Sequence, residues 1–549
     1  MKVAEVAARL LIHGLHFDNI RGDIYGGLTA AVVALPLALA FGVASGAGPI
    51  AGLYGAIFVG LFAALFGGTP AQVSGPTGPM TVVMAGVVTQ FSHEPAMAFT
   101  VVMLAGLLQI LFGVLKLGRY IHLMPFPVVS GFMSGIGVII IILQLAPLVG
   151  HTAPGGGVLV ALANTPLAYS SPAIEATGVG LLALFIVFVW PSRLGRIVPS
   201  ALVALVIGTL VAIFALPGAP VLGEIPTGLP RPVLPVFDLV TLPLMLRAAL
   251  ILAVLGTVDS LLTSLVADNV TQTNHDSDRE LIGQGIGNAI AGLFGAIPGA
   301  GATMRTVVNV RAGGRTPISG ALHALVLLAI VLGLGGFAER IPHAVLAGIL
   351  IKVGLDIIDW GYLHRIRRAP RAGVLIMLAV LLLTVFVDLI TAVGVGVVLA
   401  SLLFVKRMAD LQLGNIHTIV SPDDGAVVDA DEAKILQAAE GRIVIYQLSG
   451  PFSFGAANGM ARLMAAADAY DALVVDLSDV PFLDSSAALA VETVIKQVQS
   501  NDKQVFISGV GSEAGRVLDK LGALSLLPPG HRHDSRHEAL IAAARALGV

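Results

Sequence analysis

The sequence contains no cysteine and few charged residues. The lack of cysteine excludes disulfides, thiolate catalysis and cysteine-based zinc or iron–sulfur sites. Only 12% of the 549 residues are charged, about half of the roughly 25% found in soluble domains. The net charge of −3 gives no support to nucleic-acid binding. HExxH and GxSxG motifs are also missing and the 13 histidines show no clear ligand spacing, so we do not expect an enzyme.

Apolar residues dominate what is present. They make up 56% of the chain, the mean hydropathy is +0.91, and the 64 glycines suit close packing and breaks in membrane helices. The sequence therefore predicts an α-helical polytopic protein that crosses a lipid bilayer. Its fourteen predicted segments are 24–45, 49–67, 76–91, 97–115, 124–149, 173–190, 197–215, 241–267, 281–297, 302–312, 317–336, 343–358, 372–388 and 389–406.

Positive charges predict the orientation of these segments. Residues 1–22 show no cleavage site after a short apolar core, so they indicate an amphipathic cytoplasmic helix and not a signal peptide. With the N-terminus inside, few positive charges fall outside, mainly Arg231 and Arg340. Lys and Arg gather in the cytoplasmic loops of membrane proteins, so this distribution favours a multi-pass protein of the inner (plasma) membrane with both termini in the cytoplasm. The predicted cytoplasmic charges are Lys116, Arg119, Arg193, Arg196, Arg279, Arg311, Arg315, Arg365, Arg367, Arg368, Arg371, Lys406 and Arg407.

The composition changes after residue 408, where the transmembrane region 23–408 ends. Charged residues become common, and apolar β-branched runs alternate with helical stretches at 455–467, 485–499 and 513–522. The runs are RIVIYQLSG, ALVVDLSDV and QVFISGV. This pattern predicts a linker at 409–440 and a small α/β domain at 441–549.

Two of the fourteen segments are short and broken by glycine and proline. GPTGPMTVVMAG (75–86) and GATMRTVVNVRAGG (301–314) share a Gly-x-Thr followed by Thr-Val-Val. Each lies in the middle of its half of the chain, and paired interrupted segments indicate a transporter's binding site. We therefore predict two facing half-helices. The halves, 23–216 and 241–407, hold seven segments each, which makes them inverted repeats.

The half-helix starts predict an anion site. A helix that begins inside the membrane exposes unpaired N–H groups and the positive end of its dipole. Gly75 and Gly301 allow close approach of the backbone. Thr77 and Thr303 offer caps and hydroxyls, and Arg305 adds a full charge that membranes seldom keep for packing alone. The alternative is a pair of kinked helices with a structural role only.

Asp259 is the acidic residue that we expect in the membrane interior. Apolar residues flank it on both sides, and Thr263 follows four residues later on the same helical face. A carboxylate and a hydroxyl on one face can bind Na⁺, or the carboxylate can take a proton. The alternative is a structural salt bridge with Arg305. Three further aspartates near predicted membrane ends are expected to be interfacial anchors: Asp356, Asp359 and Asp388.

The chain resembles the SulP family of anion transporters, which are related to the solute-carrier-26 proteins. The motifs are GDIYGGLTAAVVALPLALAFGVASG (22–46), GGTPAQVSGPTGPM (67–80), PFPVVSGFMSGIGVIIIILQL (125–145) and ELIGQGIGNAIAGLFGAIPGAGAT (280–303). The tail resembles a STAS domain through VVDLSDVPFLDSSAAL (474–489). The resemblance implies a seven-plus-seven inverted-repeat core, elevator-type movement and homodimers joined by STAS domains.

For bicarbonate-carrying members, the resemblance implies Na⁺-dependent uptake. It places bicarbonate at Thr77, Ala302 and Thr303, and Na⁺ at Asp259, Thr263, Gly301 and Thr303. Arg305 departs from that pattern and resembles the family's sulfate, chloride and dicarboxylate carriers, several of which are proton-coupled. Near Asp259, Arg305 would compete with Na⁺ for the carboxylate. The attraction between the two opposite charges would be about 4 kcal/mol at a separation of about 4 Å and an effective dielectric constant near 20. A small inorganic anion is therefore the expected substrate, and either Na⁺ or H⁺ the coupling ion.

Other functions stay open. A passive channel or exchanger would use the same site, although a leak needs no Asp259, and a membrane sensor would need no paired half-helices. In bacterial STAS regulators a serine in the DSS motif is phosphorylated. Here Asp484 or Ser485 is expected to cap a helix instead.

Overall fold

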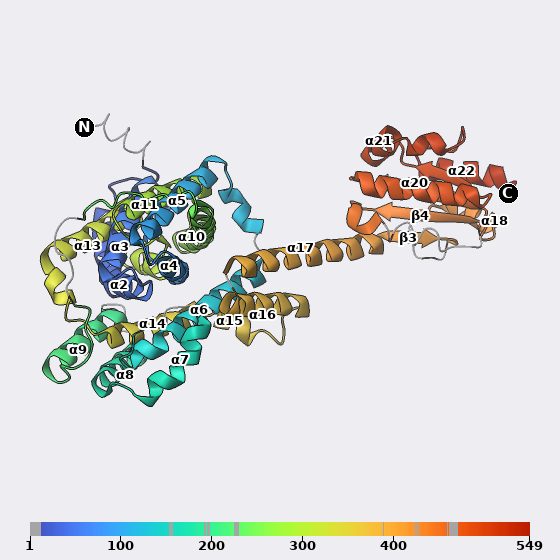
Figure 1. Cartoon of the computed structure of the whole chain (residues 1–549). Coiled ribbons are helices and arrows are strands. Elements are labelled where there is room, and N and C mark those ends of the chain that lie inside the picture. The colour runs from blue at the N-terminus through green and yellow to red at the C-terminus, as the bar shows by residue number, and fades with distance from the viewer. Residues whose placement is uncertain are drawn as a thin grey trace. The chain divides into compact units, whose positions relative to one another are not determined.

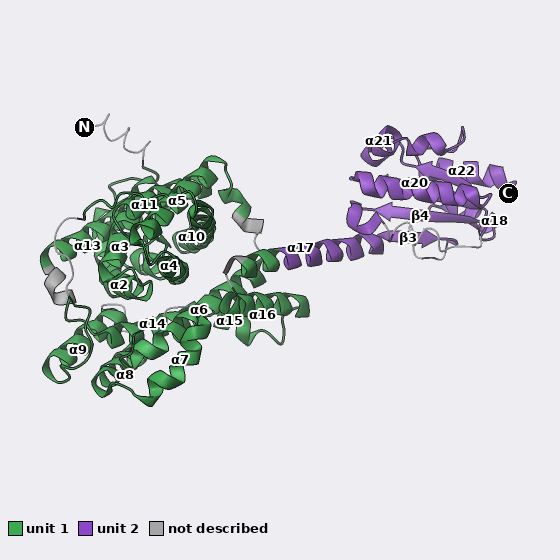
Figure 2. Ribbon diagram, in the orientation of Figure 1, with its two compact units in different colours: residues 1–397 green, residues 398–549 purple. Residues whose placement is uncertain are grey.

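A computed structural model describes residues 12–549 except 124, 153–157, 192–193, 195–197, 224–229, 388, 423, 425–427, 458 and 460–469. It divides into two compact units, residues 1–397 and 398–549 (Figure 2). Each unit is described by itself. The expected N-terminal helix lies largely outside the described residues, as do Arg193, Arg196, Asp388 and most of the helix expected at 455–467.

The first unit is helical (Figure 1). Its long or apolar helices are α2 (Ile20–Ala44), α3 (Pro49–Phe66), α5 (Pro95–Val114), α6 (Phe126–Leu148), α7 (Val158–Ser170), α8 (Ile174–Val189), α9 (Ser200–Phe214), α10 (Leu242–Thr271), α11 (Ser277–Leu293), α13 (Pro317–Ala338), α14 (His343–Ile357), α16 (Arg371–Phe386) and α17 (Leu389–Gly414), which continues into the second unit. Within the described residues, six helices are long and apolar enough to cross a membrane, or seven if the bent pair α7–α8 is one span.

Each of the fourteen predicted segments overlaps one of the unit's helices. The two short segments correspond to α4 (Gly78–Gln90) and α12 (Thr303–Arg311), which follow the short strands β1 (Ser74–Gly75) and β2 (Ala300–Gly301). The sequence missed α7, which meets α8 at a bend of 116°, and the short helix α15 (Trp360–His364). The helical polytopic fold is thus confirmed, and the inverted relation of the two halves stays a prediction.

Glycine sets the closest helix contacts. A methyl group on Gly285 of α11 would lie 2.5 Å from the Gly106 carbonyl oxygen of α5, and one on Gly137 of α6 would lie 2.4 Å from the Gly354 carbonyl oxygen of α14. Such backbone contact is how membrane helices gain packing without a hydrophobic driving force. The helices α2–α5 and α10–α13 pack in one group, and α6–α9 with α14 and α16 pack in another (Figure 1).

The second unit is an α/β domain around a four-stranded sheet. The sheet order is β3-β4-β5-β6, with β3 antiparallel to β4 and the other pairs parallel. The strands are β3 (Ile416–Ile419), β4 (Ile443–Ser449), β5 (Ala472–Asp479) and β6 (Gln504–Ser508). The helices are α18 (Ala430–Ala438), α20 (Ser485–Ser500), α21 (Glu513–Lys520) and α22 (Arg536–Leu547).

The segment 409–440 differs from the predicted linker. It holds the end of α17, then β3, whose backbone pairs with β4, and then α18. Glu432 of α18 accepts hydrogen bonds from Arg536 of α22 at 3.0 and 2.7 Å, and this contact raises the pKa of the guanidinium. The domain therefore begins before residue 441. The earlier start of the domain is hard to predict from the sequence because β3 is short and partly polar.

Asp484 caps α20. Its Oδ1 accepts a hydrogen bond from the Ala487 N–H (2.8 Å), and its Oδ2 accepts one from the Phe454 N–H (2.7 Å). The side chain thus satisfies an unpaired N–H of the first helical turn and holds the loop in front of it. The capping interpretation of the DSS motif is confirmed for Asp484.

We predict that Asp484→Ala weakens the first turn of α20. Losing a carboxylate cap costs about 1 kcal/mol, or about fivefold in local opening. Hydrogen exchange of the full-length protein should show faster exchange at residues 486–488. Ser485→Ala is the matched control, and equal acceleration in both variants would contradict the assignment of the cap to Asp484.

Candidate anion-binding site

Two short strands cross where both half-helices begin. Ser74 of β1 lies opposite Gly301 of β2 in an antiparallel pair. The pairing continues as the Ala302 N–H donates to the Val73 carbonyl oxygen at 2.9 Å. The starts of α4 and α12 therefore lie side by side, although more than two hundred residues separate them in sequence.

The crossing requires glycine. Gly75 has a φ of +147°, a conformation that side chains disfavour. A methyl group there would also lie 2.8 Å from Arg305 Nη1 and 3.0 Å from the Ala56 Cα. On the other strand, a methyl group on Gly299 would lie 2.6 Å from the Gly75 carbonyl carbon. The backbones meet here without room for side chains.

No side chain caps either helix start in the described residues. The N-cap residues are Thr77 for α4 and Ala302 for α12, and neither makes a side-chain cap bond. The prediction that Thr77 and Thr303 act as caps therefore fails, because their hydroxyls bind other side chains and Thr303 is already the first helical residue. The first N–H groups of both helices, which carry the positive dipole ends, are therefore left without a side-chain cap beside the crossing.

Asp259 lies beside the start of α4. It is buried on α10, and its Oδ2 accepts a hydrogen bond from the Thr77 hydroxyl at 2.7 Å. It forms no ion pair with Arg305 within 4.0 Å, although both residues are among those described. The alternative of a direct Asp259–Arg305 salt bridge is thus not what the structure shows.

Thr263 connects α10 to the start of α12. Its hydroxyl donates to the Gly301 carbonyl oxygen at 2.9 Å and lies 2.7 Å from the Thr303 hydroxyl. Because the Thr263 proton points at Gly301, Thr303 is the donor of the second bond. The Gly301 carbonyl oxygen and the Thr303 hydroxyl thus both lie against the Thr263 hydroxyl, and these are three of the four residues that the family resemblance assigned to a cation.

Arg305 is buried, with 2% of its surface exposed. Its Nη2 donates to the Pro76 carbonyl oxygen, directly before Thr77, so the side chain reaches from α12 to the start of α4. Its Nη1 has no hydrogen-bond partner among the described residues. An unsatisfied, buried charged donor is costly. Arg305 thus offers the free NH₂ group of Nη1 beside the two helix starts.

The described weaker acidic candidates have structural partners. Asp356 pairs with Lys352 on α14. Asp359 caps α15 through the Tyr362 N–H and also accepts a hydrogen bond from the Ser130 hydroxyl. Both fit the anchor role that the sequence suggested.

Sequence reasoning missed a buried carboxylate behind the crossing. Glu280 of α11 is 1% exposed and accepts four hydrogen bonds, two of them from Gln72 and Gln284. Asn288, two turns further along α11, bonds both the N–H and the carbonyl of Gly299. The signal was the spacing of polar residues at 280, 284 and 288 on one face of an apolar helix.

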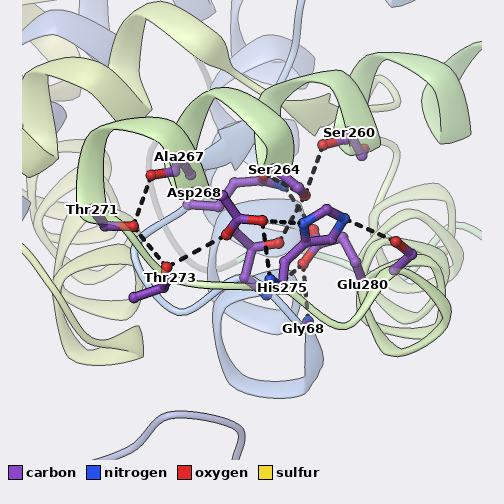
Figure 3. A network of polar contacts seen from close by, with 12 residues as sticks. Gly68, Ser260, Ser264, Ala267, Asp268, Thr271, Thr273, His275 and Glu280 are labelled. Atoms are coloured by element: carbon purple, nitrogen blue, oxygen red, sulfur yellow. Dashed lines mark hydrogen bonds and ion pairs between the residues drawn. The ribbon is translucent and has the colours of Figure 1, made fainter. Parts of the chain in front are cut away.

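Glu280 also lies next to the turn that joins α10 to α11. Figure 3 shows it near His275, whose Nδ1 lies 2.6 Å from Asp268 Oδ2. The turn is attached to the loop before β1 by two hydrogen bonds, from the Asp276 N–H to the Gly68 carbonyl oxygen (3.1 Å) and from the Gly68 N–H to Glu280 Oε2 (2.9 Å). The α10–α11 turn and the approach to β1 are thus held as one body.

A cavity of about 760 Å³ lies between the two helix groups. Its wall includes residues from α2 and α4 on one side and from α6 and α14 on the other, and none of the predicted site residues lines it. Residues on its wall include Ala40, Val82, Leu143 and Leu346.

Comparison with known proteins identifies the family. Residues 20–380 match the sulfate permease family, and residues 435–539 match the STAS domain. The chain belongs to the sulfate permease family. It is 50% identical over 537 residues to the bicarbonate transporter BicA of Picosynechococcus sp., covering 96% of this chain and 95% of that protein. It is 30% identical to the putative sulfate transporter YvdB of Bacillus subtilis, covering 86% and 88%.

Solved structures agree with this assignment. The transmembrane domain of a cyanobacterial bicarbonate transporter BicA is 54% identical, with a TM-score of 0.67, and matches 70% of this chain and 100% of its own. Murine Slc26a9, an anion transporter in the inward-facing state, is 20% identical with a TM-score of 0.82, covers 100% and 95%, and supports the fold alone. The chain is a multi-pass membrane transporter and not an enzyme.

We predict that Gly75→Ala disrupts the site. The added methyl group meets Arg305 Nη1 and the Ala56 backbone and strains φ, so anion uptake by the reconstituted protein should fall about tenfold or more. Gly333→Ala, on α13 with nothing within 4 Å and outside the wall of the cavity, is the control and should transport normally. Wild-type uptake by a properly folded Gly75→Ala protein would show that the crossing tolerates expansion.

Proposed function

We propose that this chain is a secondary active transporter that takes up bicarbonate together with Na⁺. The observation that carries the proposal is the crossing itself, which joins the residues in front of two uncapped half-helices beside a buried carboxylate. The relationship to transporters of bicarbonate and sulfate supports a small oxyanion as the substrate. A sensor that acts through the STAS domain alone would not need the two half-helices α4 and α12.

The anion half of the site uses the helix starts. N–H groups at the starts of α4 and α12 supply donors and positive dipole ends, which favour an anion without a counter-ion from the solvent. The hydroxyls of Thr77 and Thr303 lie at these starts, but here they donate to Asp259 and Thr263, so the helix N–H groups are the main donors left for the anion. Ala302 is the N-cap residue of α12. Bicarbonate, which is planar and small, fits between two facing helix starts.

The cation half uses the oxygen atoms on α10 and β2. Asp259 supplies a carboxylate, and the oxygens of Thr263, Gly301 and Thr303 already converge. Hard cations prefer such oxygen ligands. The Asp259 carboxylate lies close to the anion half, since Thr77 donates a hydrogen bond to it. Its negative charge would repel the anion, and Na⁺ near Asp259 would neutralise that charge. Each ion therefore increases the affinity for the other, which is the basis of symport.

The arrangement of helices supports an elevator mechanism. All of the proposed ligands lie on α4, α10, α12 and their strands, within one of the two helix groups. That group could carry both ions past α6–α9, α14 and α16 as one body, because Asn288, Glu280 and the crossing hold its parts together. The cavity between the groups lies where relative movement would occur.

Arg305 favours a second candidate function. Its free Nη1 beside the helix starts could take a further oxygen of sulfate or a dicarboxylate, and the charge on Arg305 could replace that of Na⁺. Transport would then be proton-coupled through Asp259, or would be anion exchange. We further infer an inner-membrane location with both termini in the cytoplasm, and a homodimer formed through the STAS domain.

We predict that an inward Na⁺ gradient stimulates uptake of labelled bicarbonate into liposomes, and that Asp259→Asn abolishes the stimulation. An amide keeps a hydrogen bond with Thr77 but lacks the charge that attracts Na⁺. Asp356→Asn is the control, because its carboxylate pairs with Lys352 away from the site. Wild-type uptake without a Na⁺ effect, but driven by a proton gradient, would replace sodium coupling with the second candidate.

We also predict that Arg305→Gln raises the KM for the transported anion about tenfold or more. A hydrogen bond from a charged group contributes about 1.5–3 kcal/mol. Arg311→Gln, on the exposed last turn of the same helix, is the control. An unchanged KM in Arg305→Gln would show that the guanidinium only joins α12 to Pro76 and does not contact the anion.

A further inference from the structure

Glu280 is a buried carboxylate whose four hydrogen-bond donors are all uncharged N–H groups. Its Oε2 accepts from the backbone N–H groups of Gly68 and Thr69, both at 2.9 Å. Its Oε1 accepts from Gln72 Nε2 at 2.7 Å and from Gln284 Nε2 at 2.8 Å. Each oxygen thus faces two donors. No ion pair involves Glu280 in the part of the chain that the structure describes, so its four donors define both its charge and its orientation.

Glu280 in turn orients Gln72. Because the carboxylate can only accept, the Gln72 side chain must present its NH₂ group to Glu280 and its carbonyl to the other side. There the Gln72 Oε1 lies 3.1 Å from the Ser264 hydroxyl of α10, whose single proton is shared with the Ser260 carbonyl oxygen at 3.0 Å. Ser264 also lies 2.7 Å from the Thr69 hydroxyl, which belongs to the same loop. The amide is therefore locked between α11 and α10.

The oriented amide of Gln72 lies against Gly301. A methyl group on Gly301 would come within 2.5 Å of Gln72 Nε2 and 3.0 Å of the Thr263 Cβ. The Gly301 N–H donates to the Ser260 hydroxyl at 3.0 Å, while its carbonyl oxygen accepts from Thr263. Gly301 is thus confined between Gln72 and α10, and the direction of its carbonyl depends on the position of Gln72.

From these contacts we propose that Glu280, which touches neither ion, is a positioning residue that sets the affinity for the coupling cation. It acts through Gln72 on the Gly301 carbonyl oxygen, one of the ligands in the cation half of the site. This inference rests on the proposed function, since it presupposes a cation held by Asp259, Thr263, Gly301 and Thr303.

Replacing Glu280 with glutamine tests whether its four accepted hydrogen bonds matter, since the substitution keeps the size of the side chain. The amide has nearly the same shape, but its NH₂ group must face one of the two donor pairs. In one orientation it opposes the N–H groups of Gly68 and Thr69, and in the other it opposes the NH₂ groups of Gln72 and Gln284. A buried donor opposite donors is costly, so the loop or Gln72 must move. Either movement displaces the support of Gly301.

The test is a cation titration with the full-length protein in liposomes. Labelled bicarbonate uptake is measured against external Na⁺ at saturating bicarbonate, and against bicarbonate at saturating Na⁺. We expect Glu280→Gln to raise the Na⁺ concentration for half-maximal uptake about fivefold or more, as for loss of one buried hydrogen bond, while the bicarbonate KM stays within about twofold. Gln72→Leu keeps the other three donors to Glu280 and should shift the Na⁺ dependence in the same direction.

Asp276→Ala is the matched control. It removes the cap of α11, where Asp276 accepts from the Arg279 N–H at 3.0 Å, but not the contact with Gln72. Its Na⁺ dependence should be that of the wild type, and an equal shift would overturn the inference by showing general loosening of α11. An unchanged Na⁺ dependence in folded Glu280→Gln and Gln72→Leu would also overturn it. If Glu280→Gln does not fold, Gln72→Leu decides alone. Wild-type uptake without Na⁺ dependence would overturn the sodium proposal and this inference together.

Discussion

Two helix starts with the same partial charge lie close together in one helix group of a membrane protein, and the backbone pairing of Ser74–Gly75 with Ala300–Gly301 is what holds them. Like dipole ends repel, and a low-dielectric surrounding strengthens that repulsion. The buried guanidinium of Arg305 adds to it. Asp259 on one side and Glu280 behind the crossing supply negative charge in the same body. The glycines, the uncapped helices and the buried polar network all follow from this arrangement.

The same balance explains why the proposed substrate and cation would bind together. The crossing has N–H donors at two helix starts and no side-chain cap to satisfy them, so the proposed anion would complete it. Asp259 opposes that anion until a cation or proton neutralises it. Thr77 lies at the boundary, because it begins α4 and donates to Asp259. The positive charge of Arg305 further favours anions at the site. Because that charge could replace the charge of Na⁺, the coupling ion of this chain depends on Arg305.

Much of this architecture could be predicted from the sequence because apolar periodicity and glycine-broken segments are local signals. They located the membrane helices, both half-helices and the group of Thr77, Asp259, Thr263 and Thr303. The hydrogen-bond partners of a buried side chain, in contrast, often lie far away in the sequence. The sequence could not show that Asp259 bonds Thr77 and not Arg305, nor that Glu280 gathers donors from a loop two hundred residues earlier. The 13-residue helix α7 and the four-residue strand β3 were missed because their apolar patterns are brief.

In the proposed mechanism the anion binds between the starts of α4 and α12. The most direct measurement is a pair of cryo-electron microscopy maps of the full-length protein in lipid nanodiscs, with and without saturating bicarbonate and Na⁺. The account predicts difference density beside Thr77 and Thr303, within hydrogen-bond distance of both helix starts. Density confined to the cavity between α2, α4, α6 and α14, with the crossing unchanged, would contradict it.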